Sequence, residues 1–182
     1  MKKMTNYLFT SERLGFRNWR DSDLDKLYEM NSSPAVMEFF PSTQTREHCR
    51  GFIQRMQQQY AEIGYCYFAV ETLAEGRLIG FIGISKQTYE AEFTPCTDIG
   101  WRLLPSAWGK GYATEGAKRC LEYAFETLGL EEVVAVAPAI NAKSISVMQK
   151  IGLSYYYNFD HSLMPHDERL RNCVLWGRLM DV

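Results

Sequence analysis

The sequence lacks any long hydrophobic run, since no stretch approaches the roughly 20 apolar residues that a membrane-spanning helix needs. Its N-terminal region has two lysines with no apolar segment after them, which argues against a signal peptide. An excess of positive charge is also missing, because 20 Lys+Arg and 22 Asp+Glu give a formal net charge of -2. Proteins dedicated to nucleic acids usually carry a strong basic excess. We therefore expect neither a membrane nor a nucleic acid as a partner.

The sequence also lacks a cysteine pattern typical of disulfides or zinc. Its five cysteines are an odd number, are scattered and include no C-x-x-C pair: Cys49, Cys66, Cys96, Cys120 and Cys173. This pattern predicts reduced thiols in a cytoplasmic protein. His161 and His166 lie beside acidic residues, but their spacing is no standard zinc pattern, so no metal is expected.

Linkers and repeats are absent as well. No Pro/Gly/Ser-rich segment divides the 182 residues, and 46% of them are apolar, which suffices for one hydrophobic core. Charged residues make up 23%, close to the average of folded proteins. We expect a single domain over residues 1–182.

Apolar periodicity predicts alternating strands and helices. Apolar runs and alternation favour strands over residues 14–19, 65–72, 77–85, 96–104, 133–137, 153–159 and 173–179. Apolar residues spaced three or four apart favour helices over residues 24–31, 45–63, 112–128 and 141–151. Asp21 is expected to cap the first helix and Asn141 the last.

The uninterrupted apolar run at 133–137 is typical of a strand buried on both faces. Because it follows a strand and then a helix, it predicts a βαβ crossover and one parallel strand pair. The expected fold is therefore α/β in the broad sense (α+β). It has a mixed, mostly antiparallel central sheet of about seven strands.

A glycine pair precedes the helix at 112–128. Gly109 and Gly111 have no Cβ to block the approach of a ligand, and Lys110 adds positive charge. The first N–H groups of a helix have no intrahelical partners and lie at its positive end. Together these features favour a phosphate or pyrophosphate site. Taken alone, the two glycines fit a tight turn equally well.

Two further features surround this turn. Gly100 lies inside a predicted strand, where glycine often marks a bulge that frees main-chain groups for a ligand. Asn141 opens the helix after the parallel strand, near the same edge of the sheet. A ligand with a pyrophosphate and an amide-bearing arm, such as coenzyme A, fits this arrangement.

The runs IGWRLLPSAWGKGYATEGAKRCLEYAF and VVAVAPAINAKSISVMQKIGL resemble the Gcn5-related N-acetyltransferases, abbreviated GNAT. The resemblance spans SERLGFRNWRDSD, LIGFIGI and NCVLWGRL as well. It is strongest toward the ribosomal-protein alanine acetyltransferases (RimJ/RimL-like). The family signature Gln/Arg-x-x-Gly-x-Gly/Ala begins here with Trp108, which departs from it at the first position.

The resemblance implies the GNAT fold, acetyl-CoA as cosubstrate and transfer of its acetyl group to a primary amine. Amides from Gly109 to Thr114 would hold the pyrophosphate, and the main chain of residues 101–103 would pair with the pantetheine arm. The cofactor-binding residues implied are Trp101, Arg102, Leu103, Trp108, Gly109, Lys110, Gly111, Tyr112, Ala113, Thr114, Asn141 and Ser144.

The implied mechanism is direct attack by the amine in a ternary complex. A main-chain N–H near Arg102 or Leu103 would bind the oxyanion. Ser144 is the candidate proton donor to the leaving thiolate, because it stands three residues after Asn141 as in the ribosomal-protein enzymes; its alternative role is local main-chain bonding. Many relatives use a tyrosine as the donor instead, but Tyr155, Tyr156 and Tyr157 lie beyond the usual position of that tyrosine. Asp98 is the candidate base. Its rivals are polar residues of 160–168, namely His161, His166 and Asp167.

A covalent route through a cysteine is discounted, because no cysteine pairs with a histidine in the sequence. The alternative function is a non-catalytic coenzyme A-binding sensor or scaffold with the same fold. The acceptor stays undefined among peptide N-termini, small amines and aminoglycosides. Both a monomer and a homodimer fit the sequence.

Overall fold

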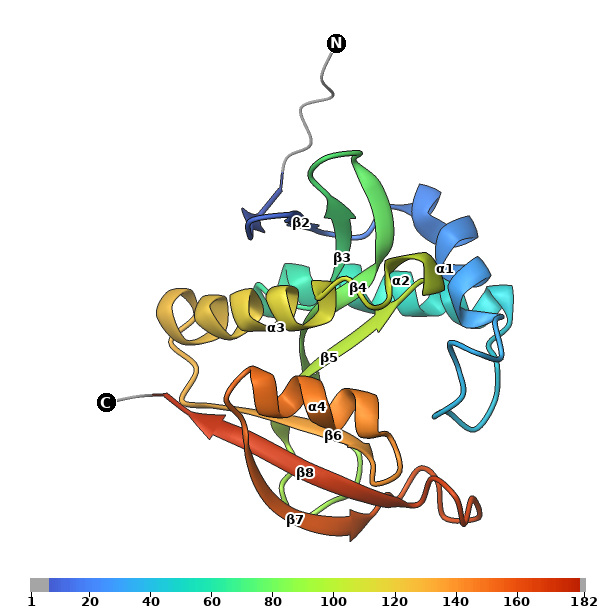
Figure 1. Cartoon of the computed structure of the whole chain (residues 1–182), viewed down its shortest axis with the longest axis vertical. Helices are drawn as coiled ribbons and strands as arrows, with labels where there is room; N and C mark the ends of the chain where they lie inside the picture. Colours follow the sequence, from blue (N-terminus) through green and yellow to red (C-terminus); the bar gives the residue numbers. More distant parts are fainter. Residues whose placement is uncertain (1–6, 181–182) are drawn as a thin grey trace.

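The protein is described by a computed structural model over residues 7–180. Within these residues one eight-stranded sheet has the order β1-β2-β3-β4-β5-β6-β8-β7 (Figure 1). Its strands are β1 (Phe9–Thr10), β2 (Leu14–Arg17), β3 (Tyr67–Thr72), β4 (Arg77–Gln87), β5 (Cys96–Leu103), β6 (Glu132–Pro138), β7 (Ser154–Asp160) and β8 (Asn172–Leu179). Every neighbouring pair is antiparallel except β5 and β6. The predicted mixed α+β fold is therefore confirmed.

Helices cover both faces of this sheet. They are α1 (Leu24–Asn31), α2 (Arg46–Ile63), α3 (Tyr112–Glu122) and α4 (Ala142–Lys150). Phe52 of α2 packs against Phe81 of β4, whereas Gly116 of α3 packs against the next β4 residue, Ile82. Because successive strand side chains point to opposite faces, α2 and α3 lie on opposite sides of the sheet. In Figure 1, α2 passes behind the strands and α3 in front of them.

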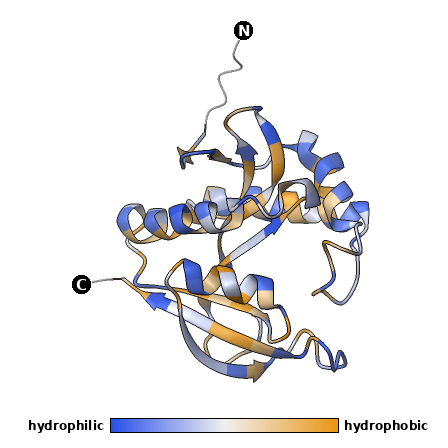
Figure 2. Cartoon of the chain, in the orientation of Figure 1, coloured by the Kyte–Doolittle hydropathy of each residue, from blue (hydrophilic) through white to orange (hydrophobic). Residues whose placement is uncertain are grey.

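Strands, helices and connecting segments all contribute apolar residues to the core. Figure 2 shows hydrophobic segments in several strands and an alternation of hydrophobic and hydrophilic residues along the helices. Phe16, Phe68 and Ile82 are fully buried. The Gly116 position has no space for a Cβ, which would come within 2.4 Å of the Ile82 side chain. This close approach sets α3 tightly against the sheet.

Three local predictions needed correction. The sheet has eight strands, not about seven, because the two-residue strand β1 is too short to show periodicity. The helix predicted over 112–128 is α-helical only to Glu122 and continues as a π-turn, η3 (Tyr123–Thr127). Asp21 does not cap α1: it lies in a 3-10 turn, η1 (Asp21–Asp23), and accepts a hydrogen bond from Gln57. The cap by Asn141 is confirmed, since its Oδ1 accepts from Ser144 N at 3.1 Å.

The sheet splits between β5 and β6. The two parallel strands are paired at a single position, Asp98 with Val134. In contrast, β5 is paired with β4 in unbroken register from Gln87–Cys96 to Gly80–Leu103. The prediction of a bulge at Gly100 is therefore wrong. The divergence of β6, and not a bulge, leaves main-chain groups of β5 without a neighbouring strand. Gly100 has a different reason to be glycine: its Cβ would lie 3.0 Å from the Tyr67 ring.

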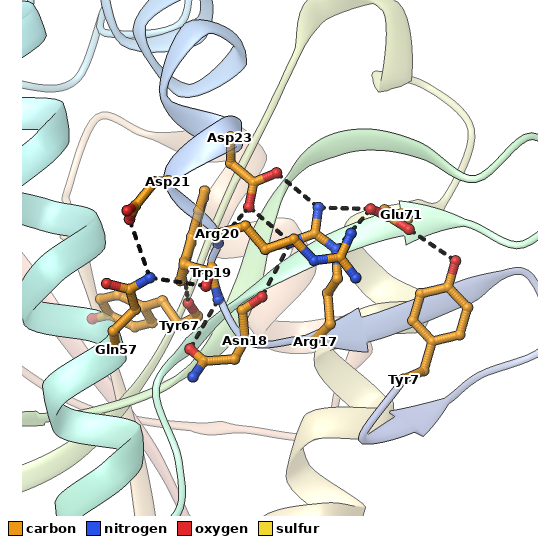
Figure 3. A network of polar contacts seen from close by, with 10 residues as sticks. All are labelled: Tyr7, Arg17, Asn18, Trp19, Arg20, Asp21, Asp23, Gln57, Tyr67 and Glu71. Atoms are coloured by element: carbon orange, nitrogen blue, oxygen red, sulfur yellow. Dashed lines mark hydrogen bonds and ion pairs between the residues drawn. The ribbon is translucent and has the colours of Figure 1, made fainter. Parts of the chain in front are cut away.

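A buried charge network fastens the N-terminal strands (Figure 3). Arg17 of β2 donates through Nη1 and Nη2 to the two carboxylate oxygens of Asp23 at 2.7 and 2.8 Å. Its Nε donates to Glu71 of β3 at 2.6 Å, and Tyr7 donates to the same carboxylate. Burial opposes the charge of Arg17, yet the bonds and charges of Asp23 and Glu71 raise its pKa.

We expect Arg17→Met to lower the free energy of unfolding by about 3 kcal/mol, because it leaves two buried carboxylates unpaired. Lys26→Met is the matched control: Lys26 pairs with Glu29 on the exposed side of α1, where an ion pair contributes less than about 1 kcal/mol. Urea denaturation measures both. Equal losses in the two variants would show that Arg17 is not a structural clamp.

Among residues 7–180, no helix is both long and apolar enough to cross a membrane.

Candidate active site

The turn before α3 has the form of an anion cradle. Gly109 and Gly111 have φ of 71° and 78°, in the left-handed region that glycine favours. Gly111 is the N-cap of α3 and supplies no side chain to bind the first N–H groups of the helix. The main-chain N–H groups of Tyr112, Ala113 and Thr114 therefore have no intrahelical acceptor. A Cβ at Gly109 would meet nothing within 4 Å, so this side of the turn is accessible.

Arg13 braces the cradle from the N-terminal side. Its Nη1 donates to the carbonyl of Lys110 at 3.0 Å, and its Nε donates to Glu115 of α3 at 2.6 Å. Ser11 donates to the other oxygen of Glu115, at 2.6 Å. Burial opposes ionisation of Glu115, but the bonds from Ser11 and Arg13 hold its pKa below the ordinary value. The turn thus keeps its shape through side chains about a hundred residues away in sequence.

Trp108 joins the cradle to its neighbours. Its indole Nε1 donates to the carbonyl of Leu103 at 2.8 Å, across the mouth of the split between β5 and β6. The ammonium of Lys143, in the first turn of α4, lies 5.4 Å from the centre of the Trp108 ring. The glycine turn and the start of α4 therefore lie at the same end of the split. The sequence predicted this neighbourhood for Gly109–Gly111 and Asn141.

Part of the main chain of β5 faces the split and is not bound by β4. Leu104 N donates to the carbonyl of Ile79 at 2.8 Å, and antiparallel bonds recur at every second residue. The main-chain groups of Arg102 and Gly100 therefore face β4. Those of Trp101 and Leu103 face away from it, toward the region that β6 has left. An extended ligand in the split would meet Trp101 and Leu103 through their main chain, but Arg102 only through its side chain.

Asp98 lies where the split begins. Its Oδ1 accepts a hydrogen bond from the Tyr67 hydroxyl at 2.5 Å and another from Gln87 Nε2 at 3.1 Å. The Gln87 amide also donates to the Tyr67 oxygen at 2.9 Å, which closes a three-membered network. Trp19 Nε1 donates to the Tyr67 carbonyl at 2.6 Å and so helps to hold the start of β3 in place (Figure 3).

The environment of Asp98 suits it to proton transfer near neutral pH. Burial raises the pKa of Asp98 to about 6, although hydrogen bonds from Tyr67 and Gln87 act in the opposite direction. Burial and the neighbouring Asp98 raise the Tyr67 pKa well above its ordinary value, so Tyr67 stays a donor. A base is most effective when its pKa lies near the operating pH.

Asn141 and Ser144 lie at the start of α4. The Asn141 carbonyl oxygen is occupied by capping, which leaves its amide nitrogen as the group that can donate to a ligand. Ser144 is half-buried, and its own N–H is the one bound by that cap. The main-chain N–H of Ser144, and not its hydroxyl, makes the local hydrogen bond at the start of α4.

The rival groups have other local roles. Asp167 Oδ1 accepts from the N–H groups of Arg169 and Leu170 within its own loop. His161 stacks on Tyr89 with ring centres 4.5 Å apart, and burial lowers its pKa. Burial also raises the pKa of the Cys66 and Cys120 thiols, which opposes a nucleophilic role. In the described part of the chain, no three His, Cys, Asp or Glu side chains gather closely enough to hold a metal ion.

Sequence reasoning missed four side chains around this site: Arg13, Tyr67, Gln87 and the side chain of Arg102. None belongs to a local motif. The one signal for Tyr67 is a pair of glycines, Gly83 and Gly100, which stand opposite each other in adjacent strands. Such a pair indicates that a large side chain packs against the sheet over these two glycines.

The split sheet and the glycine turn at the start of α3 fit an acyl-CoA N-acyltransferase, and the comparison with known proteins shows the class. The sequence profile of the acetyltransferase (GNAT) domain matches residues 13–154. A relative from Bacillus subtilis, the uncharacterized N-acetyltransferase YnaD, is 34% identical over 79% of this chain and 81% of its own length. The chain therefore belongs to the GNAT acetyltransferase family, whose members use acetyl-CoA as cosubstrate.

Solved structures agree on the fold. A GNAT-family acetyltransferase from Bacillus anthracis superposes with a TM-score of 0.79 at 28% identity, over 93% of this chain and 96% of that one. The ribosomal-protein-S5-alanine acetyltransferase from Vibrio fischeri superposes with a TM-score of 0.76 at 18% identity, over 95% and 96%. The second likeness concerns the fold alone.

Proposed function

We propose that residues 1–182 act as one cytoplasmic acetyltransferase domain that moves an acetyl group from acetyl-CoA to a primary amine by direct attack in a ternary complex. The observation that carries this proposal is the position of Asp98. Its carboxylate, with a pKa of about 6, lies at the single bridge where the sheet starts to split. The thioester and the amine would meet at that point.

The chain's own groups then divide the work. The N–H groups of Tyr112 to Thr114 would bind the pyrophosphate, with Lys110 adding charge and Asn141 a side-chain donor. The main chain of Trp101 and Leu103 would pair with the pantetheine arm. The N–H of one of these two residues would also bind the oxyanion as the amine attacks.

Proton transfer completes the scheme. Asp98 accepts the proton that the amine loses, directly or through water, and has acceptor capacity on Oδ2 because Tyr67 and Gln87 both bind Oδ1. Ser144 donates a proton to the leaving thiolate, whose unperturbed pKa is about 8.5. The proton that Asp98 took from the amine returns through water to Ser144, so both groups regain their starting states. Acetyl passes from sulfur to nitrogen, and coenzyme A leaves with a protonated thiol.

We keep two classes of acceptor, small amines and peptide N-termini. The second is supported by the sequence likeness to the ribosomal-protein alanine acetyltransferases (RimJ/RimL-like).

The test is release of free thiol from acetyl-CoA in the presence of a mixed panel of small amines and peptides. We expect release that depends on the acceptor and on its concentration. Coenzyme A binding without any acceptor-dependent release would instead support the alternative function, a sensor or scaffold with this fold. Both outcomes begin from demonstrated cofactor binding. They exclude each other because acceptor-dependent release of thiol either occurs or does not occur.

A further inference from the structure

Arg102 is a half-enclosed cation on the face of the sheet opposite α3. Its guanidinium lies 4.1 Å from the centre of the Phe40 ring and 5.2 Å from that of Phe81. Its Nη1 donates to Asn31 Oδ1 at 2.9 Å. Asn31 ends α1 and Phe40 belongs to the segment that joins α1 to α2, so Arg102 faces that segment.

No anion neutralises this guanidinium. Its Nε is buried without a hydrogen-bond partner, and none is found for Nη2 in the described part of the chain. No carboxylate among residues 7–180 forms an ion pair with it, whereas Arg17, also buried, has two. Burial lowers the Arg102 pKa to about 10, and the neighbours that oppose this, Tyr67 and Cys49, are themselves neutral at pH 7.

An unpaired guanidinium in such a site costs free energy that a bound anion returns. The unpaired guanidinium of Arg102 lies beside the proposed reaction centre. Asp98 and Arg102 project from β5 on the same face, four residues or about 13 Å of strand apart. Gly100 lies between them without a side chain, over the Tyr67 ring. A small molecule on this floor would have one end at Asp98 and the other at Arg102.

We propose that the acceptor is an amino acid whose carboxylate stands several carbon atoms from the reacting amine, with the amine at Asp98 and the carboxylate at Arg102. The amine and carboxylate of an α-amino acid lie within about 4 Å of each other and cannot reach both side chains. This inference rests on the proposed acetyl transfer and names its acceptor class. A carboxylate can bind the guanidinium at Nη2, which Asn31 leaves free, and lies then beside the buried and unpartnered Nε. Phe40, which stays 38% exposed, stacks over the guanidinium at the entrance from the segment between α1 and α2.

The test compares acceptors that differ only in the carboxylate. Linear amino acids with increasing chain length between the amine and the carboxylate, their primary amides and their decarboxylated amines are assayed for kcat/KM with the wild type. The α-amino acids are the members too short to span the two side chains. Peptide amides that begin with Asp or Glu form a separate arm, because they bring a carboxylate on a polymer. We expect at least one free amino acid to exceed its own amide by about thirtyfold and to exceed the peptides.

Arg102→Met should then lower kcat/KM for that amino acid about thirtyfold, to the level of its amide, with the amide changed less than twofold. Arg102→Lys should recover part of the loss, and Arg77→Met, which removes an exposed cation at the hairpin, should change nothing. Circular dichroism and coenzyme A affinity establish that each variant is folded. Equal loss for acid and amide would overturn the proposal, as would better turnover of the peptides.

A binding measurement separates this inference from the proposed function. Calorimetry with coenzyme A present measures the affinity of the same amino acids and amides for the wild type and for Arg102→Met. Carboxylate-dependent binding without thiol release would refute the proposed transfer while supporting the role of Arg102. Thiol release with equal affinity and rate for acids and amides would refute the role of Arg102 alone. The inference is overturned if the carboxylate brings neither tighter binding nor faster turnover.

Discussion

Asp98→Asn should lower kcat about a thousandfold, within the range that positioned acid–base groups contribute. The amide keeps an oxygen to accept the bonds from Tyr67 and Gln87 but cannot take a proton from the amine. In the wild type, kcat/KM should fall about tenfold per pH unit below the Asp98 pKa of about 6, where the carboxyl is protonated, and level off above it. Steady-state kinetics from pH 5 to 8 measure both effects.

The matched control is Asp167→Asn, which removes the rival carboxylate and keeps an oxygen for its loop bonds. We expect it to retain full activity and the acidic limb of the pH profile. An Asp98→Asn enzyme with normal kcat and the same acidic limb would remove Asp98 from the mechanism. Loss of both features in Asp167→Asn instead would transfer the role of base to Asp167.

Gly111→Trp should weaken coenzyme A binding about a thousandfold, as seen by calorimetry. An indole at the N-cap of α3 would occupy the space before the N–H groups of residues 112–114. Three bonds to charged oxygens, at about 1.5 kcal/mol or more each, are then lost. The Cβ itself is accommodated, since its nearest neighbour, Arg13, lies 3.5 Å away.

Backbone strain is the confounding effect, because Gly111 has a positive φ. Gly129→Trp reproduces that strain at a site with φ of 64° and nothing within 4 Å of the new Cβ. The two variants should lose similar stability, yet only Gly111→Trp should lose cofactor affinity. A Gly111→Trp protein that binds coenzyme A within tenfold of the wild type would place the pyrophosphate elsewhere.

Local patterns predicted the scaffold well. The helix at 112–128 and the strand at 133–137 follow from periodicity within one segment, and the glycine turn and the Asn141 cap are short motifs. The two-residue strand β1 and the π-turn after Glu122 leave no such signal, since neither changes the apolar pattern. The bulge assigned to Gly100 shows the limit of a single residue as a marker: its missing Cβ makes room for the Tyr67 ring.

The side chains around the proposed reaction centre were harder to predict. Tyr67 meets Asp98 across 31 positions, and Arg102 meets Asn31 across 71. Such contacts depend on which strands become neighbours and on the register between them. The sequence showed Arg102 as part of a strand that a ligand would follow, whereas its unpaired charge is visible only once Asn31, Phe40 and Phe81 surround it.

The hydrogen bond from Trp108 to Leu103 has a consequence for the edge of β5. Beyond Asp98, the side of β5 that faces the split is an unpaired strand edge, the kind of surface on which another chain can assemble. The indole occupies one of its carbonyls and stands partly exposed across the opening. A side chain from the following turn thus covers one acceptor of this edge where no neighbouring strand does so.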